Sequence, residues 1–286
     1  MAEEKKKVSI QKFPFTDSQL YQRVNTGEKY NFSEAELQEM YRNILGCIDL
    51  TTLEGSDNDE KVKALCNQAV GFRDEERGIP ATASVCVYPP FAATAKEALK
   101  DSGVKVATVA GAFPAGQAPI ALKVAEVKYA VENGADEIDM VISRGKFLAG
   151  RYQEVYDEIL AIRKACLGKK LKVILETGEL KTPQNIFIAS QLAIYAGADF
   201  LKTSTGKISV NATTEAFWVM AFAIKMHYQS TGKKVGIKAA GGISTPDEAL
   251  KYANIWIQNM GKEWFTPELF RIGASRLAGK VFDKIQ

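Results

Sequence analysis

The sequence predicts an α/β fold, a (β/α)8 TIM barrel that carries an N-terminal helical extension. Short apolar runs alternate with longer stretches in which apolar residues recur every three or four positions. Strict alternation of this kind is typical of parallel strands joined by helices. The predicted strand ends follow one another at intervals of about 32 residues, the length of one strand–helix unit. Eight such units in about 240 residues favour a closed barrel over an open sheet.

The predicted strands are rich in Val and Ile and are bounded by Gly, Pro, Asp or Ser, as expected of strands buried on both faces. They span residues 44–49, 83–88, 104–109, 137–142, 171–175, 200–203, 235–238 and 269–272. Helical periodicity is found between them. The predicted helices span residues 57–72, 115–132, 151–165, 182–196, 213–228 and 245–257.

The first part of the chain is expected to form a tail and capping helices over residues 1–42, followed by one catalytic barrel over residues 43–286. Ser33 and Glu36 form a capping box at the start of a helix over residues 33–41. No linker rich in Pro, Gly or Ser separates the two parts. The lysine run 5–7 is interpreted as a solvated tail rather than a nucleic-acid or membrane contact.

The composition excludes several classes of function. A net charge of +3, spread along the chain, predicts no nucleic-acid surface. No window of about 18 apolar residues predicts a membrane span, and no signal peptide is recognised. No G-x-G spacing and no Gly-Lys-Ser or Gly-Lys-Thr occurs, which argues against a nucleotide cofactor.

The cysteines and the histidine narrow the choice further. Four cysteines without a C-x-x-C pair are interpreted as free thiols in a reducing compartment, so we expect a cytoplasmic protein. Since His227 is the single histidine and lies in a predicted outer helix, we expect no metal site and assign it no catalytic role.

Two lysines are the most informative candidates, because the active site of such a barrel lies at the C-terminal ends of the strands. Lys202 and Lys238 each end an apolar strand, where lysine is rarely buried without a function. On adjacent strands they would lower each other's pKa. A fall of roughly three units from ~10.4, about 4 kcal/mol, gives a neutral amine, the nucleophile of Schiff-base chemistry. The alternative is an ion pair with Asp139 or Glu176.

Asp139 is the candidate acid–base group. In a strand it shares a face with Glu137 and Val141, so it points into the barrel among apolar neighbours. It is either a salt-bridge partner of a lysine or a proton shuttle that works with both lysines.

Glycine-rich turns follow the last two predicted strands and open helices. Gly241 and Gly242 follow the seventh strand, and Gly273 to Ser275 follow the eighth. Loops at these places, with helix N-termini behind them, form the usual phosphate site of the barrel, and Lys207 adds a positive charge. The alternative interpretation is that they are merely tight turns.

Five segments in the right order resemble the deoxyribose-phosphate aldolase family, and the similarity runs from about residue 43 to residue 278. The segments are Ile-Asp-Leu-Thr-Thr-Leu at 48–53, Val-Cys-Val-Tyr-Pro at 85–89, Glu-Ile-Asp-Met-Val at 137–141, Lys-Thr-Ser-Thr-Gly at 202–206 and Lys-Ala-Ala-Gly-Gly at 238–242.

The resemblance implies a class I aldolase, a carbon–carbon lyase that needs no cofactor. It implies reversible cleavage of 2-deoxy-D-ribose 5-phosphate to acetaldehyde and D-glyceraldehyde 3-phosphate, in the breakdown of deoxyribonucleotides. The implied partners are this phosphosugar and these aldehydes, with a possible homodimer. The alternatives are another Schiff-base phosphosugar aldolase, a transaldolase-like enzyme, or a non-catalytic barrel that binds a sugar phosphate.

Residue roles also follow from the resemblance. Lys202 is the implied Schiff-base lysine, Lys238 the neighbour that lowers its pKa, and Asp139, with a water, the proton relay. Asp49 and Thr205 hold the sugar hydroxyls or support the lysines. Cys86 lies near the substrate without being essential, although a small buried apolar side chain is its simpler interpretation. The implied phosphate contacts are Gly206, Lys207, Gly241, Gly242, Gly273 and Ser275.

Three positions depart from the family pattern. Ala239 stands where many members have proline, and we expect little effect because the neighbouring lysine and glycines are retained. Arg276 stands where many bacterial members have a second serine, which strengthens or crowds phosphate binding. The last tyrosine is Tyr252, so a tyrosine-bearing C-terminal tail is absent and a lower rate is expected.

Overall fold

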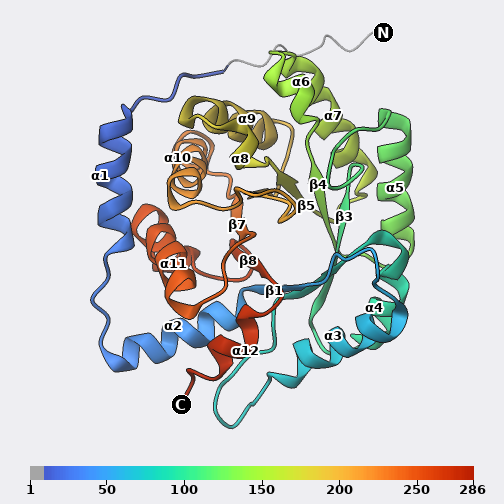
Figure 1. The fold of residues 1–286 in the computed structure, drawn as a ribbon, viewed down its shortest axis with the longest axis vertical. Helices are drawn as coiled ribbons and strands as arrows, with labels where there is room; N and C mark the ends of the chain where they lie inside the picture. Colours follow the sequence, from blue (N-terminus) through green and yellow to red (C-terminus); the bar gives the residue numbers. More distant parts are fainter. Residues whose placement is uncertain (1–9) are drawn as a thin grey trace.

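A computed structural model describes residues 10–286 and confirms the predicted fold class. Eight parallel strands form a closed barrel in chain order, in which β1 also pairs with β8 (Figure 1). The strands are β1 (Ile48–Thr51), β2 (Ser84–Val87), β3 (Lys105–Ala110), β4 (Glu137–Val141), β5 (Lys170–Ile174), β6 (Phe200–Lys202), β7 (Gly236–Ala240) and β8 (Phe270–Ala274).

Helices surround the barrel and connect its strands (Figure 1). They are α1 (Asp17–Glu28), α2 (Glu34–Gly46), α3 (Asp59–Gly71), α4 (Ala92–Ala98), α5 (Ile120–Glu132), α6 (Arg144–Leu148), α7 (Tyr152–Ala165), α8 (Thr177–Leu180), α9 (Pro183–Tyr195), α10 (Thr214–Thr231), α11 (Pro246–Met260) and α12 (Leu277–Phe282). Two short 3-10 turns, η1 (Pro89–Phe91) and η2 (Lys262–Trp264), follow β2 and α11.

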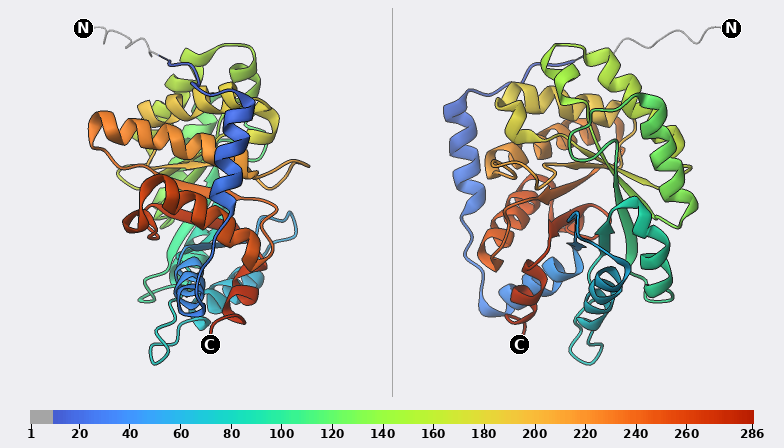
Figure 2. Two further views of the ribbon diagram at one scale, coloured as in Figure 1. Left: turned by 90° about the vertical axis from the view of Figure 1, so that its left-hand side faces the viewer. Right: turned by 45° about the vertical axis from the view of Figure 1, so that its right-hand side comes forward.

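The N-terminal extension packs against the outside of the helical layer. Helix α1 runs along α10 and α11, and α2 packs against α11 and α12 (Figure 2). The Asn254 side chain on α11 donates to the carbonyls of Gly27 and Lys29, at 2.8 and 2.9 Å, and so anchors the end of α1. The predicted capping box between Ser33 and Glu36 is confirmed at the start of α2. The lysine run 5–7 lies outside the described residues.

The predicted start of the first strand was wrong. Residues 44–46 form the last turn of α2, and β1 begins only at Ile48. Ile44 and Leu45 extend the buried stripe of Met40 and Tyr41 on the same helix, and a short apolar run does not distinguish a buried helix from a strand. The predicted boundary after residue 42 therefore falls inside α2.

Other elements were missed or shortened by the sequence analysis. Helices α4 and α12 are only seven and six residues long, too short for a clear helical period. Strands β7 and β8 each continue two residues beyond their predicted ends, through the small residues Ala240 and Ala274. These continuations keep the ladder between β7 and β8 intact up to the pairing of Ala240 with Gly273.

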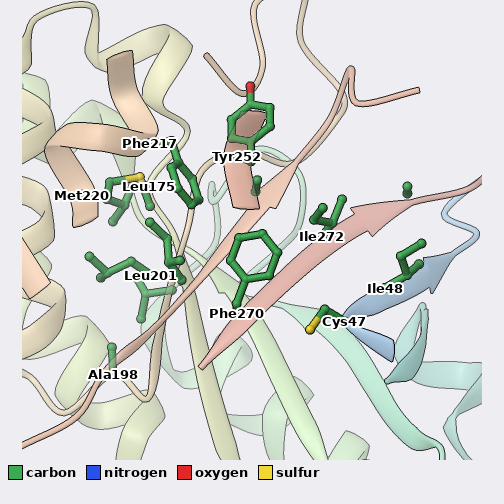
Figure 3. Close-up of a cluster of buried hydrophobic side chains, with 14 of the residues drawn as sticks. Cys47, Ile48, Leu175, Ala198, Leu201, Phe217, Met220, Tyr252, Phe270 and Ile272 are labelled. Atoms are coloured by element: carbon green, nitrogen blue, oxygen red, sulfur yellow. The ribbon is translucent and has the colours of Figure 1, made fainter. Parts of the chain in front are cut away.

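The main apolar core lies between the strands and the outer helices rather than inside the barrel. Phe270 of β8 packs edge-on against Phe217 of α10, with ring centres 6.3 Å apart, and Phe217 packs against Tyr252 at 5.2 Å (Figure 3). Leu201 and Ile272 point into the same layer and are fully buried. This layer leaves the opposite faces of the strands free to carry other side chains into the barrel.

The last residues of the chain are fastened to the outside of the barrel. Gln38 on α2 donates to the Lys284 carbonyl at 3.1 Å and accepts from the Gln286 amide at 2.9 Å. Arg42 donates to the Gln286 carbonyl, and Arg77 to the Ile285 carbonyl. Within the part of the chain that the structure describes, no helix combines the length and the apolar character needed to cross a bilayer.

Replacing Gly236 with alanine is expected to destabilise the fold. A Cβ on this residue would lie 2.6 Å from Cδ1 of the buried Phe200 ring. Overpacking of this kind costs about 1–3 kcal/mol. Urea denaturation measures the loss. Gly71→Ala is the matched control, because a Cβ there meets nothing within 4 Å. Equal stability of the two variants would contradict the packing described here.

Candidate active site

The register of the strands brings charged residues together inside the barrel. Lys202 of β6 lies opposite Lys238 of β7, and Asp139 of β4 lies opposite Lys172 of β5. Contacts also join strands that do not pair, such as Asp139 with Lys238. Since side chains of non-neighbouring strands can meet only across the interior, these residues point into the barrel.

Asp139 is the centre of the cluster. Its Oδ2 accepts hydrogen bonds from Lys202 Nζ at 2.8 Å and from Lys238 Nζ at 2.7 Å. Its Oδ1 accepts from Lys172 Nζ at 2.8 Å. Burial alone would raise the pKa of Asp139, but the three lysines outweigh burial and hold that pKa well below its usual range. The carboxyl group is therefore ionised.

A second layer of charges lies beneath these contacts. Arg271 of β8 donates to Asp49 Oδ1 at 2.6 Å and to Glu137 Oε1 at 2.9 Å. Lys172 Nζ lies 2.5 Å from Glu137 Oε2, and Lys238 Nζ lies 2.5 Å from Asp49 Oδ2. None of Lys172, Arg271 and Glu137 was among the site residues expected from the sequence.

The cluster contains more positively charged side chains than carboxylates. The three carboxylates face Lys172, Lys202, Lys238 and Arg271. All seven side chains are buried. The cluster is electrically balanced only if one of the four cations loses its proton.

The pKa values indicate which cation that is. Burial lowers the pKa of Lys202, and Lys238 lowers it further against the opposing effect of Asp139. Burial also opposes the charge on Lys238, but Asp139 and Asp49 outweigh burial and raise its pKa. The expectation that the two lysines lower each other's pKa is therefore wrong for Lys238, because that lysine contacts two carboxylates. Of the three lysines in the cluster, Lys202 is the one whose pKa is lowered, so it gives up its proton most readily.

A cavity of about 800 Å³ opens above the cluster at the C-terminal ends of the strands. Of the cluster, Lys202 lines this cavity, while Lys172 and Lys238 are not in its lining. The other expected site residues that line it are Thr205, Gly206, Lys207, Gly241, Gly242, Gly273 and Ser275. Asp49 and Cys86 are fully buried and are not in its lining, so Asp49 is placed to support Lys238.

Steric constraints explain why glycine occupies three positions in the cavity lining. Gly241 and Gly242 adopt φ angles of +83° and +85°, which favour glycine. Gly273 leaves room for a lysine, because a Cβ there would lie 2.9 Å from Lys238 Cε. The sequence patterns predicted these turns, and the lysine packing adds a second function for Gly273.

Glu176 organises the loop after β6. It is fully buried and adopts a left-handed φ of +57°, which is uncommon for a residue with a side chain. Its carboxylate accepts from the Thr205 amide at 3.1 Å, from Thr205 Oγ1 at 2.5 Å and from Arg144 at 2.8 Å. The Thr205 hydroxyl is thus engaged within the protein, and Glu176 fixes the loop that follows Lys202.

The wall beside the lysines is apolar. Cys86, Leu53, Ala107 and Val109 form a small buried cluster on the β1–β3 side of the barrel. Burial raises the pKa of Cys86, so its thiol stays protonated. Among residues 10–286, no group of His, Cys, Asp and Glu has the make-up of a metal site. His227 lies on α10 in the outer layer.

Comparison with known proteins places this site in context. A family model described as DeoC/LacD family aldolase matches residues 44–261. The deoxyribose-phosphate aldolase of Mus musculus is 46% identical over 245 residues, which cover 82% of this chain and 77% of the mouse protein. That of Homo sapiens is 45% identical with the same coverage. A solved deoxyribose phosphate aldolase from Aeropyrum pernix, described as tetrameric, matches with a TM-score of 0.69 at 25% identity, covering 88% of this chain and 97% of the other.

Arg271→Met is expected to destabilise the protein by about 3–5 kcal/mol, because it breaks buried ion pairs with both Asp49 and Glu137. Urea denaturation at neutral pH measures the change. Lys96→Met is the control: its ion pair with Asp136 is half-exposed and is worth about 0–1 kcal/mol. If both variants lose the same small amount, Arg271 does not hold the cluster together.

Proposed function

The chain belongs to the DeoC/LacD aldolase family, and on this basis we propose that its barrel cleaves 2-deoxy-D-ribose 5-phosphate reversibly to acetaldehyde and D-glyceraldehyde 3-phosphate. The reaction runs through a Schiff base on Lys202. One observation carries the assignment of this residue: of the lysines in the cluster, Lys202 alone lines the cavity and has a lowered pKa. A neutral, accessible amine is what attack on a carbonyl requires.

The neutral amine of Lys202 adds to the C1 aldehyde of the open-chain sugar to form a carbinolamine, which takes up a proton and loses water to give an iminium ion. The C3 hydroxyl then gives up its proton and the C2–C3 bond breaks. Its electron pair moves into the iminium to form an enamine, while glyceraldehyde 3-phosphate is released. Protonation of the enamine at C2 and hydrolysis of the iminium release acetaldehyde and the free lysine.

Asp139 lies where protons must move, since it touches the reacting nitrogen of Lys202 at 2.8 Å. Its lowered pKa makes it a weak base. We therefore assign it a relay role, in which it orients the amine and passes protons through a hydrogen-bonded water. Lys238 stays charged and keeps Asp139 ionised.

The polar end of the cavity suits the phosphate. The loops after β6, β7 and β8 all contribute residues to its lining, and a Cβ on Gly206 would lie 3.9 Å from Gly241 Cα. Backbone amides of such turns bind phosphate oxygens, and Lys207 and Arg276 line the same region with positive charge. Leu53, a member of the small apolar cluster around Cys86, also lines the cavity, and we assign the two-carbon fragment to that side.

We further propose a cytoplasmic location and a homodimer. The location is supported by the four cysteines, which are all buried and unpaired, as in a reducing compartment. The homodimer stays a prediction, and the relative from Aeropyrum pernix is described as a tetramer.

Borohydride reduction in the presence of acetaldehyde is expected to attach a two-carbon group to the peptide that carries Lys202, because reduction traps the iminium. Peptide mapping by mass spectrometry locates the adduct. Lys202→Met is expected to abolish both the adduct and the cleavage of the phosphosugar.

The outcomes of this experiment separate the alternatives. An adduct on Lys238 would exchange the roles of the two lysines within the same class of enzyme. A folded protein that binds the phosphosugar but forms no adduct would contradict the aldolase function and favour a binding protein. Far-ultraviolet circular dichroism of Lys202→Met controls for folding.

The charge balance predicts opposite shifts of the pH profile in two variants. Activity rises with pH as Lys202 loses its proton. Lys172→Met removes a cation, so the cluster is balanced with Lys202 protonated and its pKa rises. The rise in activity is then expected at higher pH, by about one unit or more.

Asp49→Asn removes a carboxylate instead, so the pKa of Lys202 falls and activity is expected to persist to lower pH. The measurement is kcat/KM for 2-deoxy-D-ribose 5-phosphate against pH in the wild type and both variants. Shifts in the same direction would contradict the charge-balance argument even if both variants lose activity.

A further inference from the structure

One ion pair joins two residues that line the cavity, Lys207 and Glu54. Lys207 Nζ lies 3.0 Å from Glu54 Oε1. Lys207 belongs to the loop after β6 and Glu54 to the loop after β1, and both residues line the cavity. The side chains are 29% and 62% exposed. An ion pair this exposed contributes little to stability, so it is readily exchanged for another.

The backbone of Glu54 is fixed. Its amide donates to Asp57 Oδ2 at 2.9 Å, and its carbonyl accepts from the Asp57 amide at 3.1 Å. The Asp57 carboxylate in turn accepts from Thr52 Oγ1 at 2.9 Å and pairs with Lys61 at 2.5 Å. Glu54 is therefore held at the rim of the cavity by a built turn.

The backbone of Lys207 is fixed as well. Its amide donates to Thr205 Oγ1 at 3.1 Å, and Thr205 is bound to the buried Glu176. With both backbones anchored, only the two side chains need to turn for the ion pair to open. Lys207 then presents its ammonium group to whatever anion enters the cavity.

We propose that Glu54 determines the affinity of this site for phosphate by competing with it for Lys207. This inference rests on the proposed function of the cavity. The carboxylate carries one negative charge, whereas a phosphate monoester carries nearly two and has three acceptor oxygens. A phosphorylated sugar therefore displaces Glu54, and an unphosphorylated sugar does not.

The competition affects release as well as binding. When a phosphorylated product leaves, Glu54 takes back the ammonium group, so Lys207 is never left without a counter-charge at the rim. Arg276 lines the same cavity and has no carboxylate partner in the described part of the chain. It supplies a positive charge that Glu54 does not neutralise.

Glu54→Gln tests the proposal, because glutamine keeps the size of the side chain and removes its charge. We expect KM for 2-deoxy-D-ribose 5-phosphate to fall about two- to fivefold, the range set by an exposed ion pair. The inhibition constant of inorganic phosphate should fall by the same factor. The kcat/KM for unphosphorylated 2-deoxy-D-ribose should not change.

Two further variants serve as controls. Glu60→Gln makes the same change of charge on α3, at a residue outside the cavity lining, and should leave the KM as it is. In a Lys207→Gln background, Glu54→Gln should no longer lower the KM, because the contested ammonium group is gone.

An unchanged KM and inhibition constant in Glu54→Gln would overturn the proposal. So would an equal gain for the unphosphorylated sugar, or the same gain in the Lys207→Gln background. A wild-type protein without cleavage activity or borohydride adduct would instead overturn the proposed function. In that case, calorimetric binding of inorganic phosphate to the wild type and to Glu54→Gln still decides whether Glu54 competes for Lys207.

Discussion

Three lysines share one carboxylate at the centre of this barrel, and the rest of the site depends on that shortage of negative charge. Asp139 cannot neutralise Lys172, Lys202 and Lys238 together. Asp49 compensates Lys238 and Glu137 compensates Lys172, so Lys202 remains the least compensated cation. The lowered pKa of Lys202 thus reflects burial and repulsion by Lys238, which its single carboxylate partner, Asp139, does not outweigh. The mutual repulsion of two lysines, taken alone, would have affected both of them.

Burying this many charged side chains costs the folded state free energy. Buried ions lose their hydration, and their mutual attraction offsets this free-energy cost only when the geometry is good. The apolar layer around Phe270, Phe217 and Tyr252 provides stability outside the strands, while the inner faces carry the charges. The two faces of each strand therefore serve different ends: the outer face packs against helices and the inner face arranges the chemistry.

The sequence was sufficient for the barrel and for the part of the site that lies at strand ends. Lys202 and Lys238 stood out because a lysine at the end of an apolar strand is unusual. Lys172 lies within β5 and Arg271 lies near the start of β8, so neither stood out as a charged residue at the end of an apolar strand. Lys172 is 35 residues from its partner Glu137, and Arg271 is 222 residues from its partner Asp49. Only the closed barrel brings these partners together. The pKa of Lys238 could not be inferred without knowing that Asp49 touches it.

The fastening of the C-terminal residues matters for anyone who handles this protein. Gln38 and Arg42, which hold Lys284 and Gln286, lie on α2, and that helix leads directly into β1 and Asp49. A purification tag fused after Gln286 would begin at a residue that both Gln38 and Arg42 hold, so it would compete for space with these contacts of α2.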